Sequence, residues 1–139
     1  MDLEKRKIQF CPDVTMDLRG STAGLGTSSV KIDECAQNVY DSELCEEEAL
    51  ASLLSPSTKL QIVAQKRAIL QSLGIFLPTE KDFKNLKLSL VNDSRISVRA
   101  RGRVQDAMRK QSIIDFRTSF TTNSKEILAT AIAIAANDQ

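Results

Sequence analysis

The sequence predicts a mostly α-helical fold, a small helical bundle that follows a flexible acidic amino-terminal arm. Aromatic residues make up 4% of the 139 residues, so the core must be built from Leu, Ile, Val and Ala, which favours helices over an aromatic-rich sandwich. Apolar residues recur at steps of three and four through much of the second half, which is the helical period. The alternative is an α+β fold with a β-hairpin at residues 86–101.

We expect two regions, a flexible acidic arm or docking segment at residues 1–40 and a helical domain at residues 41–139. Residues 20–29 are a small, polar run that is typical of a flexible segment. Gly24 and Gly26 lie in it, but the third glycine of a dinucleotide fingerprint and the Gly-Lys-Ser/Thr of a phosphate loop are missing. We therefore interpret residues 20–29 as a linker.

The first expected helix covers residues 43–54. Glu43 and Glu46–Glu48 fall in its first turns, where acidic residues suit the positive end of the helix dipole. Because Glu46–Glu48 are adjacent in sequence, they spread around the helix, and we expect them to be solvated.

Leu50, Leu53 and Leu54 form a Leu-x-x-Leu-Leu pattern in this helix. Such a pattern can dock into the apolar groove of a partner, although any core-facing helix has the same spacing. We take these three residues as the candidate partner-docking residues.

The second expected helix covers residues 57–73, with Gly74 as its left-handed end. Its apolar positions cover more than one narrow stripe, which predicts a central helix contacted on two sides. After it, Thr79 and Asp82 have the spacing of a capping box, which predicts a further helix start.

Residues 86–101 fit two structures. Residues 86–90 and 95–101 both alternate apolar and polar side chains across a turn-like Asn92-Asp93-Ser94, which predicts a hairpin. A helix that begins after Asp93 instead places Ile96 and Ile114 at the two ends of one apolar stripe. Long helical periodicity is less ambiguous than short alternation, so helices are favoured here.

The last expected helix covers residues 125–136. Asn123 and Glu126 resemble a capping box at its start. Residues 127–136 are apolar nearly all round, so the helix must be buried in the core or shared between copies of the chain.

Charge is divided unevenly along the chain, although the formal net charge is +1. Residues 1–57 hold eleven acidic and five basic residues, whereas residues 58–139 hold seven acidic and fourteen basic residues. Such asymmetry indicates that the second half meets a polyanion, or that the acidic arm folds back on it. The densest basic segment holds Arg95, Arg99, Arg101, Arg103, Arg109, Lys110 and Arg117.

These seven side chains are the candidate nucleic-acid-binding residues. Arginine forks match phosphate geometry, and several neutralised phosphates give salt-sensitive binding. We favour RNA over DNA as the partner, with an acidic protein surface as the other candidate. A positive surface paired with the chain's own acidic residues is the plainer interpretation.

The residue types exclude several kinds of reactive site. Histidine is absent, which removes Ser-His-Asp and Cys-His catalysis. Cys11, Cys35 and Cys45 are too few and too widely spaced for a typical zinc site. We therefore expect no catalytic residues, no metal, no cofactor and no enzymatic activity.

No stretch is long and apolar enough to be read as a transmembrane segment, and the first residues do not resemble a secretory signal. We expect an intracellular protein, cytoplasmic or nuclear. The segment Leu54-Ser55-Pro56-Ser57-Thr58-Lys59, followed by a helix, a basic segment and an Ala-rich helix, resembles the amino-terminal part of influenza-type matrix proteins. That resemblance implies an all-helical, self-assembling viral protein that binds RNA and membrane surfaces.

The function expected from the sequence is a non-enzymatic binding or assembly protein. Its arginine-rich surface would contact nucleic acid, and its last helix would serve the core or self-association. The alternatives are an adaptor or a subunit of a larger complex that docks through its arm and the Leu-x-x-Leu-Leu helix, or a viral matrix-like structural protein.

Overall fold

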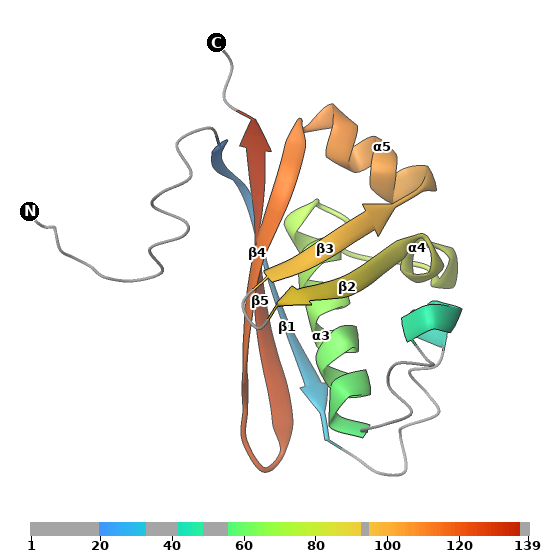
Figure 1. The fold of residues 1–139 in the computed structure, drawn as a ribbon, viewed down its shortest axis with the longest axis vertical. Helices are drawn as coiled ribbons and strands as arrows, with labels where there is room; N and C mark the ends of the chain where they lie inside the picture. The colour runs from blue at the N-terminus through green and yellow to red at the C-terminus, as the bar shows by residue number, and fades with distance from the viewer. Residues whose placement is uncertain (1–19, 33–41, 49–55, 93–94, 137–139) are drawn as a thin grey trace, which may run out of the picture.

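A computed structural model of the chain describes residues 20–32, 42–48, 56–92 and 95–136. It shows an α+β fold with antiparallel strands (Figure 1), so the prediction of a mostly α-helical bundle is wrong. In chain order the elements are β1 (Gly20–Lys31), α3 (Pro56–Ser72), α4 (Glu80–Lys84), β2 (Leu86–Asn92), β3 (Arg95–Ala100), α5 (Gly102–Lys110), β4 (Ile113–Thr122) and β5 (Glu126–Ala136). The described strands form a three-stranded sheet in the order β1-β5-β4 and a separate β2-β3 hairpin.

The apolar segment at residues 125–136, predicted as the last helix, is the central strand β5. Ile127, Ala129, Ala131 and Ala133 alternate along it and are buried on the face that packs against α3. The intervening side chains point to the other face, as the two-residue period of a strand requires. Alanine favours helices in isolation, but pairing with β1 and β4 overrides that weak preference.

Residues 20–31, predicted as part of a flexible arm, form the strand β1. Their glycines are explained by the close approach of α3. A Cβ atom built on Gly26 would lie 1.9 Å from the carbonyl oxygen of Ala68, and one on Gly24 would lie 2.0 Å from that of Ser72. The Gly-x-Gly pair therefore lets a helix backbone pack directly on a strand. The remainder of the predicted arm lies outside the described residues, and the division into two regions stays a prediction.

The hairpin that the sequence offered as the alternative is present at residues 86–100. Leu86 pairs with Ala100 and Leu88 with Val98 across β2 and β3. Leu86 and Leu88 are buried, and Val98 packs partly buried against the same core. The favoured helical interpretation of this region is wrong, because its apolar positions satisfy a two-residue period and lie against α3.

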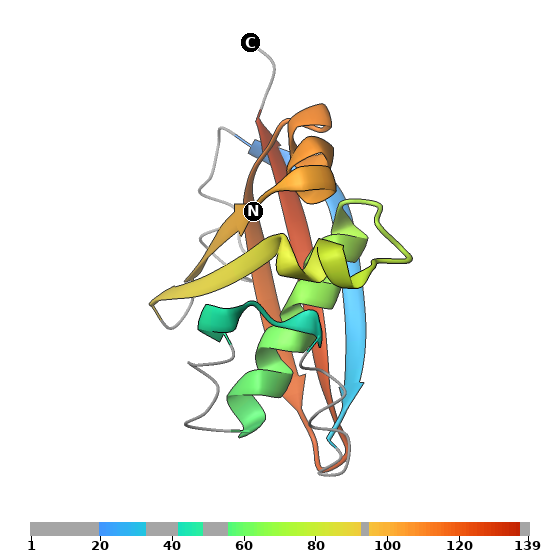
Figure 2. The ribbon, with the colours of Figure 1, turned by 90° about the vertical axis from the view of Figure 1, so that its right-hand side faces the viewer.

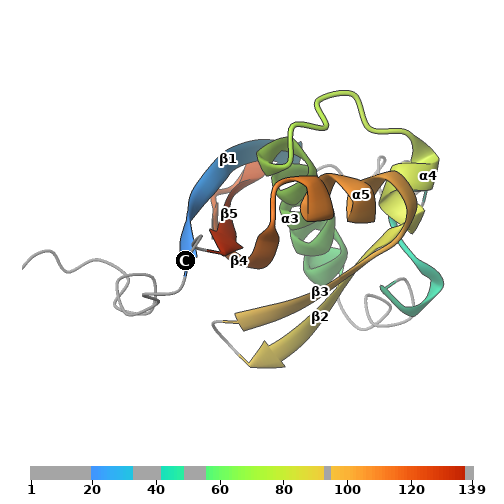
Figure 3. The same ribbon diagram turned by 90° about the horizontal axis from the view of Figure 1, so that it is seen from above.

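Helix α3 matches the predicted helix at residues 57–73 and lies at the centre of the core. Figure 2 shows it running along one face of the three-stranded sheet, and Figure 3 shows the hairpin packed beside it, next to β4. Val63, Ala64, Ala68, Ile69 and Leu70 are fully buried. The prediction of a central helix contacted on two sides is therefore confirmed.

Two short helices complete the described fold. The predicted capping box of α4 is present, because Thr79 and Asp82 each accept the other's backbone N–H. The long helix predicted after Asp93 is reduced to α5, after which the chain turns into β4. None of the helices in the described part of the chain combines the length and the hydropathy that a membrane span needs.

Candidate functional site

The predicted basic residues are distributed over both sheets and α5. Arg99 lies on β3, Arg101 lies between β3 and α5, and Arg109 and Lys110 end α5; all four side chains are exposed. Arg117 lies on β4 in the other sheet. Of Arg95, the structure describes only its place at the start of β3.

Two of these arginines bind carboxylates of the same chain. Arg103 makes a forked pair with Asp82, with Nη2 2.5 Å from Oδ2. Burial opposes ionisation of Asp82, but hydrogen bonds from Arg103 and Thr79 outweigh it and lower the pKa of the carboxyl group. Arg117 donates to Asp115, its neighbour but one on β4. These two arginines are therefore already paired with carboxylates of the same chain.

The predicted docking residues Leu50, Leu53 and Leu54 lie outside the described residues. Of the helix predicted at residues 43–54 the structure describes residues 43–48, and of these residues 46–48 are α-helical whereas residues 43–45 are not. Whether they dock a partner stays a prediction.

A groove with a polar lining lies between β1 and α3, and its volume is about 450 Å³. That volume falls in the range of small-molecule sites. It is lined by three residues of β1, two residues of α3, one further carboxylate and four apolar residues at the rim: Thr27, Ser28, Ser29, Arg67, Gln71, Glu43, Ile75, Phe76, Pro78 and Phe83.

The close packing of α3 on β1 determines where the polar helix residues of this groove lie. Ala68 and Ser72 sit against the two glycines of β1. Arg67 and Gln71 directly precede them in sequence and, four residues apart, share the next face of the helix. Gln71 accepts a hydrogen bond from the backbone N–H of Thr27. Arg67 and Gln71 are thereby held beside β1, one of the two edge strands of the described sheet.

A buried ion pair holds the segment 42–48 against α3. The Lys66 ammonium, fully buried, lies 2.7 Å from Glu48 Oε1 and donates a second hydrogen bond to the carbonyl oxygen of Phe83. The other oxygen of Glu48 accepts the Leu88 N–H. The prediction that Glu48 is solvated is wrong, because the side chain is buried and accepts hydrogen bonds from Lys66 and backbone N–H groups in place of water.

This anchored segment brings Glu43 to Arg67. Arg67 Nε lies 2.7 Å from Oε1 and Nη2 lies 2.6 Å from Oε2, so the guanidinium and the carboxylate form a two-pronged pair. The Glu43 side chain is 12% exposed, whereas that of Arg67 is 34% exposed. The positive partner is therefore the one that a solute in the groove can reach.

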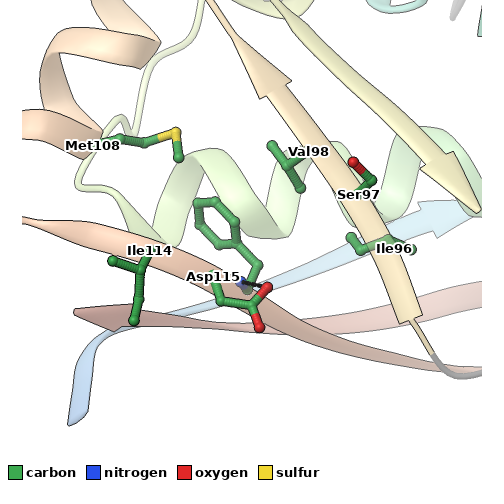
Figure 4. A pocket seen from close by; sticks show the side chains of 7 residues that line it. Ile96, Ser97, Val98, Met108, Ile114 and Asp115 are labelled. Atoms are coloured by element: carbon green, nitrogen blue, oxygen red, sulfur yellow. Dashed lines mark hydrogen bonds between the residues drawn. The ribbon is translucent and has the colours of Figure 1, made fainter. Parts of the chain in front are cut away.

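A second cavity, of about 310 Å³, lies between β3, β4 and α5. Figure 4 shows Met108 and Val98 on one side of it and Asp115 on the other. Five of its seven lining residues are apolar, and Asp115, the charged residue there, is paired with Arg117. This cavity offers no cation to an anionic ligand, in contrast to the groove at β1.

The residues of the β1 groove were not among the predicted site residues. Arg67 and Gln71 were given no function from the sequence, and Thr27 to Ser29 were interpreted as part of a linker. A usable signal was the spacing of Arg67 and Gln71, which puts two polar side chains on one face of an otherwise buried helix. The strand that faces them could not be inferred from a run of Gly, Ser and Thr.

The fold is similar to that of several solved holo-[acyl-carrier-protein] synthases. The structure from Neisseria meningitidis has a TM-score of 0.66 at 17% identity and covers 81% of this chain and 98% of that chain. The synthase from Plasmodium yoelii has a TM-score of 0.62 at 18% identity, covering 85% and 98%. The Helicobacter pylori synthase in complex with coenzyme A has a TM-score of 0.61 at 16% identity, covering 78% and 98%. No protein-family model matches the chain, and no curated protein matches its sequence.

These likenesses establish the fold, and they overturn the function expected from the sequence. The proteins that share the fold are named as synthases, so the prediction of a non-enzymatic, nucleic-acid-binding protein is contradicted. The viral, matrix-like alternative is contradicted in the same way. Local charge density misled the prediction, because it is compatible with any protein that pairs arginines with its own carboxylates.

Proposed function

We propose that this protein is a transferase that takes the phosphopantetheine group of coenzyme A and attaches it to an acyl carrier protein. A hydroxyl oxygen of the carrier would form a bond to the phosphorus next to the pantetheine. The phosphorus–oxygen bond to the nucleotide would break, 3′,5′-ADP would leave, and the hydroxyl proton would be released.

The observation that carries this proposal is the near-complete overlap with proteins of that activity. The chain covers 98% of each of the three synthases above, so the likeness extends over the whole of their fold. Solved structures of the same fold contain coenzyme A or ADP, which are nucleotides with a diphosphate. A diphosphate-containing ligand is therefore the first candidate for the groove at β1.

The groove has features that suit the parts of such a ligand. Arg67 supplies a guanidinium, whose planar fork matches phosphate oxygens. Phe76 at the rim is 70% exposed. An exposed aromatic ring is costly in water and gives an apolar surface that an adenine or a pantetheine chain can cover.

Phosphate transfer commonly uses a divalent cation held by carboxylates, and the described residues do not fit one. Within the described part of the chain, no three acidic or cysteine side chains are grouped to hold a metal. Glu43, the carboxylate that lines the groove, has both oxygens bound by Arg67. We therefore assign no step to a metal ion.

Mass spectrometry of an apo acyl carrier protein, incubated with coenzyme A and this protein, tests the proposal. The expected result is a mass gain equal to one phosphopantetheine group, with matching release of 3′,5′-ADP. The control replaces coenzyme A by pantetheine, which has no diphosphate to cleave. Several carrier proteins are tried in turn. If none of them gains mass although coenzyme A binds to this protein, the transferase assignment is contradicted.

The fold comparison gives no support to nucleic acid as a partner, and we propose the exposed Arg99, Arg101 and Arg109 as a contact surface for an acidic protein.

Self-association also stays a proposal, now through the outer face of the sheet, where Leu25 pairs with Ile132 and is 61% exposed. We expect the wild type to be oligomeric, and sedimentation tests this, because a monomer at all concentrations would refute self-association.

A cytoplasmic location agrees with the proposed transferase function, whereas a nuclear location has no support.

A further inference from the structure

We infer that Glu43 is an internal substitute for the ligand's phosphate. It occupies the Arg67 guanidinium until a diphosphate displaces it, and Arg67 then neutralises the diphosphate without a bound metal ion. The ligand class rests on the proposed function, but the exchange at Arg67 can be tested with inorganic pyrophosphate alone.

The geometry of the pair supports the exchange. A carboxylate that receives Nε and Nη2 of one guanidinium uses the same fork that binds two oxygens of a phosphate. The pair lies in the lining of the groove and is not buried behind it. The contrast with Lys66 and Glu48 is direct, since that neighbouring pair has no exposed side-chain surface to offer a solute.

The charges favour the incoming ligand over Glu43. A diphosphate carries more negative charge than a carboxylate and presents more acceptor oxygens, so its attraction to a partly exposed guanidinium is greater. Displacement leaves the Glu43 carboxylate to be rehydrated, and its place at the groove wall allows this. The Glu43–Arg67 pair therefore lowers the affinity of the groove for every anion. Anions with less negative charge and fewer acceptor oxygens than a phosphate then compete poorly for Arg67.

Three variants distinguish this exchange from a merely structural ion pair. Glu43→Gln removes the competing charge and should tighten pyrophosphate binding by about tenfold, equivalent to one charge-assisted hydrogen-bond pair. Arg67→Gln should weaken binding by about tenfold or more. Arg103→Gln breaks a similar forked pair, with Asp82, outside the groove, and should leave the affinity unchanged.

Affinities are measured by calorimetry with the full chain and inorganic pyrophosphate, in EDTA and again in Mg²⁺. We expect binding in EDTA, with the order of affinity Glu43→Gln, then wild type, then Arg67→Gln. Binding that requires Mg²⁺, or a Glu43→Gln variant that binds no tighter than wild type, would overturn the inference.

A measurement on the wild type covers the case in which a variant does not fold. The Nε–H signal of Arg67 in an NMR spectrum should shift on addition of pyrophosphate in EDTA, because its partner changes from Glu43 to phosphate. An unmoved signal at saturating pyrophosphate would refute the exchange. If pyrophosphate moves the signal but coenzyme A does not bind, the exchange stands and the proposed transferase function fails.

Discussion

Replacing Gly26 by alanine is expected to destabilise the protein strongly, because α3 packs directly on this residue. The new Cβ would lie 1.9 Å from the carbonyl oxygen of Ala68, and Cβ contacts below 3.0 Å are essentially never observed. Strand and helix must therefore separate by about 1 Å, and the obstructing atom is backbone, which cannot turn away. Overpacking of this kind costs up to about 3 kcal/mol, and for a chain of this size that lowers Tm by roughly 10 °C.

The assay is thermal unfolding followed by circular dichroism, with Ser89→Ala as the matched control. Ser89 lies on β2, away from the contact between β1 and α3, and is exposed, so its replacement should change stability by about 0.5 kcal/mol at most. Where space exists, alanine is better than glycine in a strand by roughly 0.5–1 kcal/mol. A Gly26→Ala variant as stable as wild type would therefore refute the packing of α3 on β1.

Three further outcomes are expected. Glu48→Leu leaves the buried Lys66 ammonium without its carboxylate, which should lower the free energy of unfolding in urea by about 3–5 kcal/mol. Adding Lys66→Met should restore most of that free energy. A loss below about 1 kcal/mol in the single variant would contradict the buried pair. The lowered pKa of Asp82 contributes stability that is present above the unfolded-state pKa and is lost as pH falls through the folded value. Arg103→Gln raises that folded pKa, so acid unfolding monitored by circular dichroism should begin at higher pH than in wild type. An unchanged midpoint of acid unfolding would contradict this role of Arg103. Burial raises the pKa of the Cys45 thiol, and Glu48 adds to this while Lys66 opposes it. Alkylation of Cys45 at about pH 8, followed by peptide mass spectrometry, should be slower than that of a free cysteine, and an equal rate would count against the burial.

The elements that the sequence predicts correctly are those with local signals. Helix α3 has a long periodic pattern and a glycine at its end, and Gly74 has the positive φ that this end requires. The capping box of Thr79 and Asp82 is likewise a contact within four residues. These features depend on neighbours in the sequence and so need no knowledge of the sheet.

The strands were mispredicted because their pairing is non-local. β1 pairs with β5 across more than 90 residues, for example Val30 with Ile127, and no local pattern reports that partner. β5 is rich in alanine because its inner face must admit α3, which makes a strand look like a helix. Since β1 was taken for a linker, the groove beside it could not be predicted, and Arg67 was left without a function.

The basic segment shows a different limit. Its charge was counted correctly, but the positions of Arg103 and Arg117 relative to Asp82 and Asp115 depend on how α4, α5 and β4 fold. Charge density in sequence therefore did not indicate which cations were already engaged.

An NMR titration of the wild-type protein with coenzyme A tests the central claim most directly, because it reports where the ligand binds. The expected result is saturable shifts confined to the groove at β1, including Thr27, Arg67, Gln71 and Phe76. Shifts centred instead on the cavity around Met108, or no shifts at all at millimolar coenzyme A, would contradict the assignment of the groove as the functional site.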